Sequence, residues 1–156
     1  FPKTYQNLIK AGIKEDYTLG FADQIGFRAG ICSPFYFYDL ENETKTDLMI
    51  IPFQVMDGTL LHYLNYSPVR AWDEIERIMA EVKDVGGTFV SIWHNETVND
   101  LGEWNGYREV FEKMNKMVLI NKLKTIVALI LLLHIFCCSA PPEWGKLCLH
   151  RLSRAF

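Results

Sequence analysis

The sequence has few of the residues that build covalent cross-links or metal clusters. Its 156 residues include four cysteines and four histidines. The cysteines form no C-x-x-C pair and no histidine stands at zinc-finger spacing, so neither a disulfide framework nor a structural zinc site is indicated. The sequence also lacks a basic stripe with interleaved aromatic residues, and its formal net charge is only −3. We therefore expect no nucleic-acid partner.

What the sequence does contain is an alternation of helical and strand-like patterns as far as residue 116. Helices are expected over 4–11, 67–85 and 106–117, strand-like runs over 17–31, 48–55 and 88–93, and a polar loop over 39–47. This order predicts an α/β fold with parallel strands. Because a complete (β/α) barrel takes roughly 250 residues, this segment amounts to at most about half of one. The chain opens on Phe1, and we expect it to begin inside a larger protein.

Residues 117–156 form an apolar tail that the sequence sets apart from the α/β segment. Residues 125–140 are almost wholly apolar, and Lys122 and Lys124 precede them. With no polar face, this run predicts an apolar C-terminal helix that is signal-like or membrane-spanning, and a buried terminal helix is the alternative. We expect the tail to be foreign to a domain of residues 1–116, with the boundary between Glu112 and Lys122. Membrane association would then depend on residues 125–140.

Three side chains are candidates for chemistry. His94 ends the strand-like run 88–93, and Asp57 ends the run 48–55. If these runs are neighbouring parallel strands, about 4.7–4.9 Å apart, the two side chains converge and form a charge-assisted hydrogen bond of about 2.7–2.9 Å. Arg28 lies in a run that we expect to be buried, where its charge needs a carboxylate partner, and we expect it to open onto the same face.

Three segments together resemble a known family. They are Gly-Phe-Arg-Ala-Gly-Ile-Cys-Ser-Pro-Phe-Tyr-Phe-Tyr-Asp-Leu (26–40), Pro-Phe-Gln-Val-Met-Asp-Gly-Thr-Leu (52–60) and Gly-Gly-Thr-Phe-Val-Ser-Ile-Trp-His-Asn-Glu (86–96). This pattern resembles the C-terminal half of a polysaccharide deacetylase domain. The resemblance implies a partial (β/α) barrel of that type and an acetylated glycan as substrate. It also implies that a divalent metal, usually zinc, activates the attacking water in the complete domain.

The resemblance assigns a role to each candidate residue. His94 would be the general acid to the leaving amine, Asp57 the residue that tunes it, and Arg28 the residue that orients the catalytic base. Four residues would contact the substrate, namely Ile92, Trp93, Pro34 and Phe35. The family's Asp-Asp and His-x-x-x-His motifs have no counterpart here. We therefore expect this chain to bind no catalytic metal and to be inactive as a fragment.

Two other interpretations stay open at this point. The chain could be a membrane-tethered, non-catalytic sugar-binding or scaffold module that keeps the barrel wall and its aromatic residues. It could also use Asp57 and Glu96 as the carboxylate pair of a glycoside hydrolase, which would require both groups to face a sugar-sized cleft.

Overall fold

The computed structural model describes residues 2–121 and 123–130. Within them the chain forms three α-helices, six strands and two short helices of other types. In order these are α1 (Pro2–Lys10), β1 (Glu15–Asp16), β2 (Phe35–Asp39), β3 (Thr44–Ile50), β4 (Val55–Met56), the π-helix η1 (Thr59–Tyr63), α2 (Pro68–Asp84), β5 (Phe89–His94), the 3-10 helix η2 (Gly102–Trp104), α3 (Tyr107–Asn121) and β6 (Thr125–Ile130).

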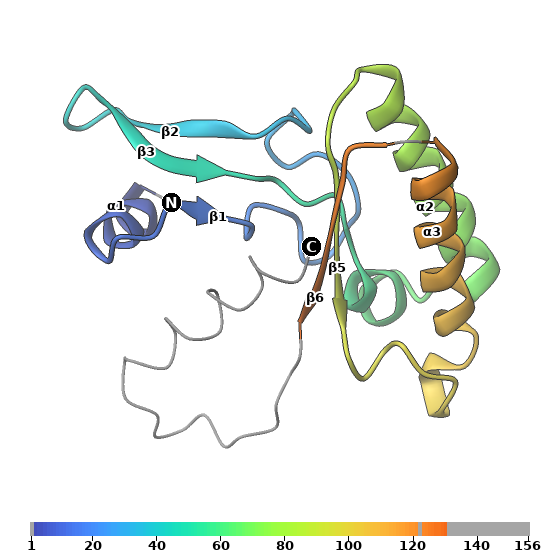
Figure 1. The fold of residues 1–156 in the computed structure, drawn as a ribbon. Coiled ribbons are helices and arrows are strands. Elements are labelled where there is room, and N and C mark those ends of the chain that lie inside the picture. Colours follow the sequence, from blue (N-terminus) through green and yellow to red (C-terminus); the bar gives the residue numbers. More distant parts are fainter. Residues whose placement is uncertain (1, 122, 131–156) are drawn as a thin grey trace, which may run out of the picture.

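The first sheet has the strand order β1-β3-β2. Strands β2 and β3 form an antiparallel hairpin, and β1 lies parallel to β3. Helix α1 covers one face of this sheet (Figure 1). A cluster of apolar side chains joins the helix to the sheet, with Tyr5, Leu48 and Ile50 buried at its centre.

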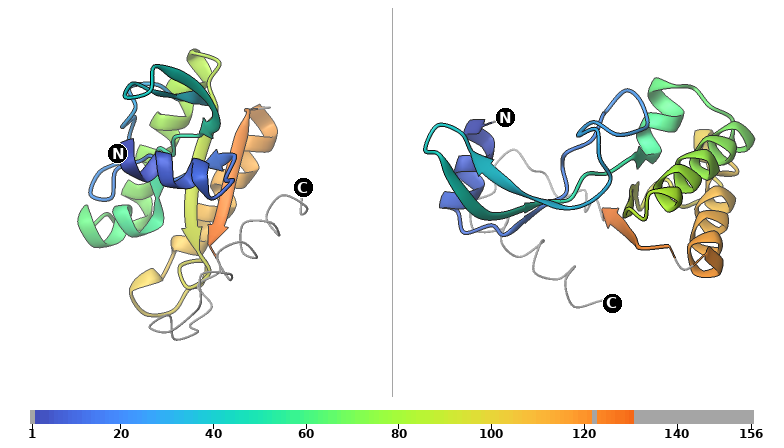
Figure 2. Two further views of the ribbon diagram at one scale, coloured as in Figure 1. Left: turned by 90° about the vertical axis from the view of Figure 1, so that its left-hand side faces the viewer. Right: turned by 90° about the horizontal axis from the view of Figure 1, so that it is seen from above.

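The second sheet has the order β4-β5-β6, and all its strands are parallel. Helix α2 connects β4 to β5, and α3 connects β5 to β6, so successive strands are added on the same side. Both helices lie side by side against one face of the sheet (Figures 1 and 2). Strand succession of this kind, with the helices on one face, is the unit from which (β/α) barrels are built. The strands of the described residues nevertheless form two open sheets and no closed barrel.

Local signals explain the best-defined elements of the second sheet. The Ser67 side chain accepts a hydrogen bond from the Arg70 backbone N–H, and Pro68 occupies the first turn of α2. These are the residue types expected at a helix N-terminus. In β5 the residues Phe89 to Trp93 are all buried, as in a parallel strand that is covered on both faces.

The chain crosses from the first sheet to the second through residues 51–54. Pro52 interrupts the strand pattern, as expected, and separates β3 from β4. Gln54 secures the crossing: its side chain accepts a hydrogen bond from the Val90 N–H (2.7 Å) and donates one to the Pro52 carbonyl (2.8 Å). Because the Gln54 side chain is buried, these bonds satisfy polar atoms that water does not reach.

Two expectations for the N-terminal half were wrong. Residues 17–34 contain no strand and form a long loop, because their apolar residues pack individually onto the two sheets. The expected polar loop 39–47 is a hairpin instead, since Thr44–Asp47 belong to β3. The polarity of that segment reflects an exposed strand end and not an absence of pairing.

The tail was also assigned wrongly as far as residue 130. Helix α3 continues to Asn121, and residues 125–130 form β6, which pairs with β5 along its whole length. A domain boundary at 116 would cut through this helix-strand unit, and the apolar helix expected from residue 125 is a strand at its start. No helix among the described residues is long and apolar enough to cross a membrane. Residues 131–156, which include most of the expected apolar helix, lie outside the described residues.

The place of β6 in the core can be tested at Ile126, which packs against the cluster of Ile51, Phe53, Val90 and Ile92. Ile126→Ala should lower the free energy of unfolding by about 1–2 kcal/mol, because it removes partly buried methyl groups. Chemical denaturation of the full chain measures this effect, with the exposed Lys124→Ala as the control. Equal stabilities for the two variants would contradict the assignment of β6 to the fold.

Candidate functional site

Asp57 and His94 meet at the carboxyl ends of two neighbouring parallel strands. Asp57 directly follows β4, His94 is the last residue of β5, and the preceding pair Met56 and Ile92 are in register. The Nδ1 atom of His94 lies 2.7 Å from Oδ1 of Asp57. The contact that the sequence predicted is therefore confirmed. Its length is that of a charge-assisted hydrogen bond.

The Asp57 carboxylate is fully buried and has four hydrogen-bond donors around it. Oδ1 accepts from the Gly58 N–H (2.6 Å) as well as contacting the His94 ring. Oδ2 accepts from the His94 N–H (2.6 Å) and from the Thr97 hydroxyl. Two backbone amides and two side chains thus replace the water that this charge has lost. A buried carboxylate without such partners would be strongly destabilising.

Thr97 is a site residue that sequence reasoning missed. Residues 94–97 form a turn in which the Thr97 N–H donates to the His94 carbonyl (3.1 Å), and the Thr97 side chain is almost completely buried. Its hydroxyl is within hydrogen-bonding distance of both Asp57 Oδ2 and the His94 carbonyl. The signal was a threonine three residues after the histidine at a strand end, a position where hydroxyls commonly bond to nearby backbone.

The His94 ring keeps limited access to solvent, with 22% of its side chain exposed. Because Nδ1 is engaged by Asp57, Nε2 is the ring nitrogen that remains for a substrate. Ile92, two residues earlier on the same strand face, is 8% exposed and belongs to the apolar cluster between the two sheets. Its expected contact with the substrate stays a prediction.

Trp93 does not fit the substrate-binding role expected of it. Side chains alternate along a strand, so Trp93 points to the face opposite to His94. There it is completely buried and contacts the Phe111 ring of α3, with ring centroids 5.1 Å apart. The indole N–H has no hydrogen-bond partner among the described residues. Trp93 is a core residue beneath α3 and cannot touch a substrate in this conformation.

Arg28 also differs from expectation, because it is exposed in a loop and does not lie in a buried strand. Its Nη1 donates to the Gly20 carbonyl (2.7 Å), and its guanidinium lies 5.9 Å from the centroid of the Phe21 ring. Neither contact involves the hydrogen-bonded pair of Asp57 and His94, which we call the dyad. Its exposure removes the expected need for a buried carboxylate partner, and its role in orienting a catalytic base stays a prediction.

Phe35 is the first residue of β2, in the first sheet, and Pro34 directly precedes it. Pro34 is exposed, whereas Phe35 packs against the cluster under α1. The dyad belongs to the second sheet, and their expected contact with a substrate there stays a prediction.

The glycoside-hydrolase interpretation fails on burial. Glu96 is exposed, but both Asp57 oxygens are enclosed and hydrogen-bonded. A carboxylate in that state cannot attack or protonate a sugar across a cleft, because no sugar atom can reach it.

Tyr107 lies within the electrostatic reach of Asp57 from the helix side. Its hydroxyl donates to the Tyr66 carbonyl (2.9 Å), and its side chain is completely buried. Burial, together with the negative charge of Asp57, raises the pKa of Tyr107 to about 12. The phenol therefore stays neutral beneath the site.

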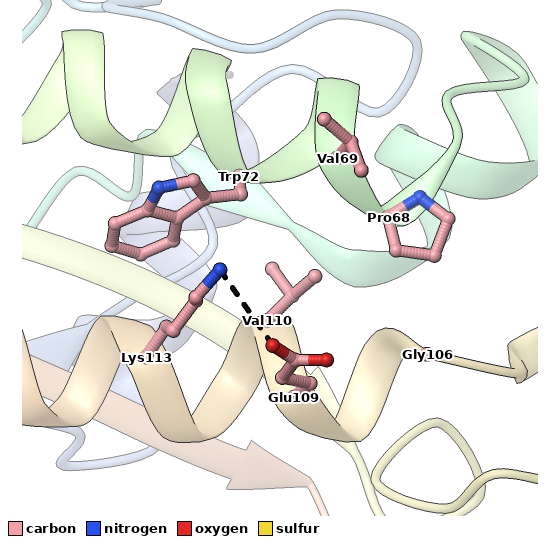
Figure 3. A pocket seen from close by; sticks show the side chains of 7 residues that line it. All are labelled: Pro68, Val69, Trp72, Gly106, Glu109, Val110 and Lys113. Carbon is pink, nitrogen blue, oxygen red and sulfur yellow. Dashed lines mark ion pairs between the residues drawn. The ribbon is translucent and has the colours of Figure 1, made fainter.

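No group of three or more histidine, cysteine or acidic side chains that could hold a metal ion occurs among the described residues. A pocket lies between α2 and α3 (Figure 3), and neither Asp57 nor His94 is among the residues that line it. Trp72 and Val110 line it, and Lys113 pairs with Glu109 (3.7 Å) at its rim. Because this pocket lies between the outer helices, it cannot bring a ligand to His94.

Comparison of the chain with protein-family models, with curated proteins and with solved structures finds no match.

The role of Thr97 can be measured through stability. Thr97→Val leaves a buried carboxylate one donor short and should lower the free energy of unfolding by about 1–3 kcal/mol. Thr97→Ser keeps the hydroxyl and should therefore keep most of the wild-type stability. The matched control is Thr59→Val, which removes a buried hydroxyl that donates to the neutral Ala22 carbonyl (2.8 Å). Bonds to charged acceptors are stronger. We call the Asp57 carboxylate with its four donors the Asp57 clamp. If Thr97→Val lowered the free energy of unfolding no more than Thr59→Val does, that result would count against it.

The raised pKa of Tyr107 predicts a pH dependence of stability. Above the ordinary tyrosine value of 10.0 the unfolded chain loses this proton, whereas the folded chain keeps it up to about pH 12. The stabilising contribution is therefore complete below about pH 10 and is lost as the pH rises through this window. Tyr17, whose pKa is raised to about 12 mainly by burial, acts in the same window. Between about pH 10 and 12 the unfolding free energy should accordingly fall less steeply with pH in Tyr107→Phe than in the wild type. Equal slopes in the two proteins would contradict this.

Proposed function

We propose that this chain carries the proton-transfer part of a hydrolase that removes acetyl groups from a glycan. The single observation that supports it is the hydrogen bond between Asp57 and His94 at the carboxyl ends of β4 and β5. This is the end of a parallel sheet at which (β/α) enzymes place their catalytic groups. The resemblance of the segments around Arg28, Asp57 and His94 to polysaccharide deacetylases gives the reaction class.

His94 would act on the leaving amine. When water has added to the acetyl carbonyl, the bond from carbon to nitrogen breaks only if the nitrogen receives a proton, and an imidazolium within hydrogen-bonding reach can supply it. Asp57 orients the ring through Nδ1, so Nε2 would deliver the proton. Asp57 is a positioning residue in this scheme, because its buried oxygens are out of reach of the substrate.

The described residues do not supply every group that such a reaction needs. The donor set for a divalent metal is not gathered among them, and the two histidines present are engaged elsewhere. His62 lies 4.0 Å from Glu103, and His94 is held by Asp57. A zinc or other divalent metal site therefore does not fit these residues, and we assign no step to one. In a complete domain the ligands would come from residues beyond those described.

A non-catalytic sugar-binding or scaffold module is the second candidate. The observation in its favour is the completeness of the Asp57 clamp, which would serve equally well to hold the turn 94–97 in place. A membrane tether for such a module could not start at residue 125, because residues 125–130 form β6.

If metal-binding motifs are encoded upstream of Phe1, as the resemblance implies, a longer polypeptide that includes them separates the two candidates. With zinc added, the deacetylase proposal expects acetate release from acetylated chito-oligosaccharides. Asp57→Asn and His94→Ala should each lower kcat by about 100-fold, which is the scale of lost general acid catalysis, without changing zinc affinity. His62→Ala is the control and should leave both quantities unchanged.

Three results would count against the deacetylase proposal. They are wild-type rates in both dyad variants, a loss of zinc affinity in His94→Ala, and glycan binding without any acetate release. The last would favour the non-catalytic module. The present chain alone should show no stoichiometric zinc binding by calorimetry and no acetate release.

A further inference from the structure

The hairpin of the first sheet carries an aromatic face that the proposed reaction does not use. In β2, Phe35 and Phe37 pack under α1, whereas Tyr36 and Tyr38 alternate with them and are 48% and 45% exposed. Lys45 is the cross-strand partner of Tyr38, and directly opposite residues share a face of the sheet. We call Tyr36, Tyr38 and Lys45 the tyrosine face.

An ammonium group already occupies this face. Lys45 Nζ lies 5.1 Å from the centroid of the Tyr36 ring, within the range of a cation–π interaction. The neighbouring Tyr38 hydroxyl lies 3.4 Å from Oε2 of Glu43, in the turn of the hairpin. A primary ammonium placed over Tyr36 would therefore have an aromatic ring beneath it, and the next exposed tyrosine of the strand, Tyr38, is in contact with a carboxylate.

The charge of the hairpin favours a cationic ligand over a phosphate-bearing one. Between Asp39 and Ile50 the sequence contains four carboxylates and one lysine. Asp39 is engaged by Asn42 and Gln6, and Asp47 pairs with Lys14 (3.5 Å), but Glu43 contacts only the neutral Tyr38 hydroxyl among the contacts seen here. A nucleic acid could stack its bases on tyrosine rings, but its phosphates would meet this excess of negative charge.

We propose that the tyrosine face binds an oligosaccharide of amino sugars, with one ammonium group over Tyr36 and the next sugar ring stacked on Tyr38, whose hydroxyl contacts Glu43. Lys45 acts as an internal competitor, because its own ammonium must leave the Tyr36 ring when the ligand binds. The preference for a primary ammonium follows from the hairpin itself. The choice of an amino sugar over a lysine-rich peptide rests on the proposed function, since deacetylation leaves a primary amine on each sugar.

This surface is distinct from the dyad. The hairpin and α1 lie at one end of the molecule and α2 and α3 at the other (Figure 2). A glycan held by the hairpin would bind through groups that take no part in proton transfer. Binding there can be measured with the present chain, without any catalytic activity.

The test is a titration of the full chain with glucosamine hexamer at mildly acidic pH. Calorimetry and the NMR signals of the tyrosine rings monitor the binding. The hexamer should shift the Tyr36 and Tyr38 signals. Tyr36→Leu should weaken binding about fivefold, the scale of one lost cation–π contact, whereas Tyr36→Phe should not. Lys45→Ala should strengthen binding about twofold to fivefold, because it removes the competitor and a like charge.

The controls match each change elsewhere on the surface. Tyr63→Leu removes another exposed tyrosine, and Lys3→Ala removes an exposed lysine of α1, so neither should alter binding. N-acetylglucosamine hexamer should bind at least about fivefold more weakly than the amine. Equal binding of the two hexamers, weaker binding by Lys45→Ala, or the absence of binding would overturn the proposal. Equal or tighter binding of hexalysine would overturn the choice of an amino sugar. A longer polypeptide that releases no acetate would sink the deacetylase proposal but leave these ring shifts unchanged.

Discussion

A fully buried carboxylate is stable only if hydrogen-bond donors replace its lost water, and Asp57 imposes this requirement on the edge of the second sheet. Its partners are the His94 ring, the N–H groups of Gly58 and His94, and the Thr97 hydroxyl. Leaving such a carboxylate one hydrogen-bond donor short costs about 1–3 kcal/mol. The end of β5, the turn that follows it and the start of η1 are therefore fixed by the same group. The orientation of the histidine results from this requirement for folding, whatever reaction the residue serves.

The arrangement of the strands makes this clamp available for chemistry. Because β4, β5 and β6 succeed one another with both connecting helices on one face, Phe89 and Trp93 turn toward the helices, and Ile92 and His94 turn toward the other face. Core side chains fill the helix side of β5. The opposite side carries the His94 imidazole, which is partly exposed. The alternation of side chains along β5 therefore places the candidate catalytic residue on one face of the strand and the core packing on the other.

The sequence predicted the second sheet better than the first, for identifiable physical reasons. The helix that begins after Ser67 and the strand ending at His94 carry strong local signals, and strand succession then predicted the contact between Asp57 and His94. Residues 17–31 are apolar because they cover other elements, and no local pattern distinguishes that from a strand. The run from residue 125 is apolar throughout, which suits a buried helix and a buried parallel strand equally well, so only pairing with β5 decides. Thr97 was missed because its partner Asp57 is distant in sequence.

The central claim is that Asp57 fixes the His94 ring so that Nε2 is the nitrogen presented to a substrate. Correlation of ring protons with ring nitrogens by NMR, at a pH high enough to leave the imidazole neutral, tests it most directly. The account predicts that Nδ1 carries the proton, that this proton resonates far downfield because it is shared with a carboxylate, and that Nε2 carries none. A neutral ring with its proton on Nε2 would show that Asp57 does not hold His94 in the proposed way, and would contradict the account.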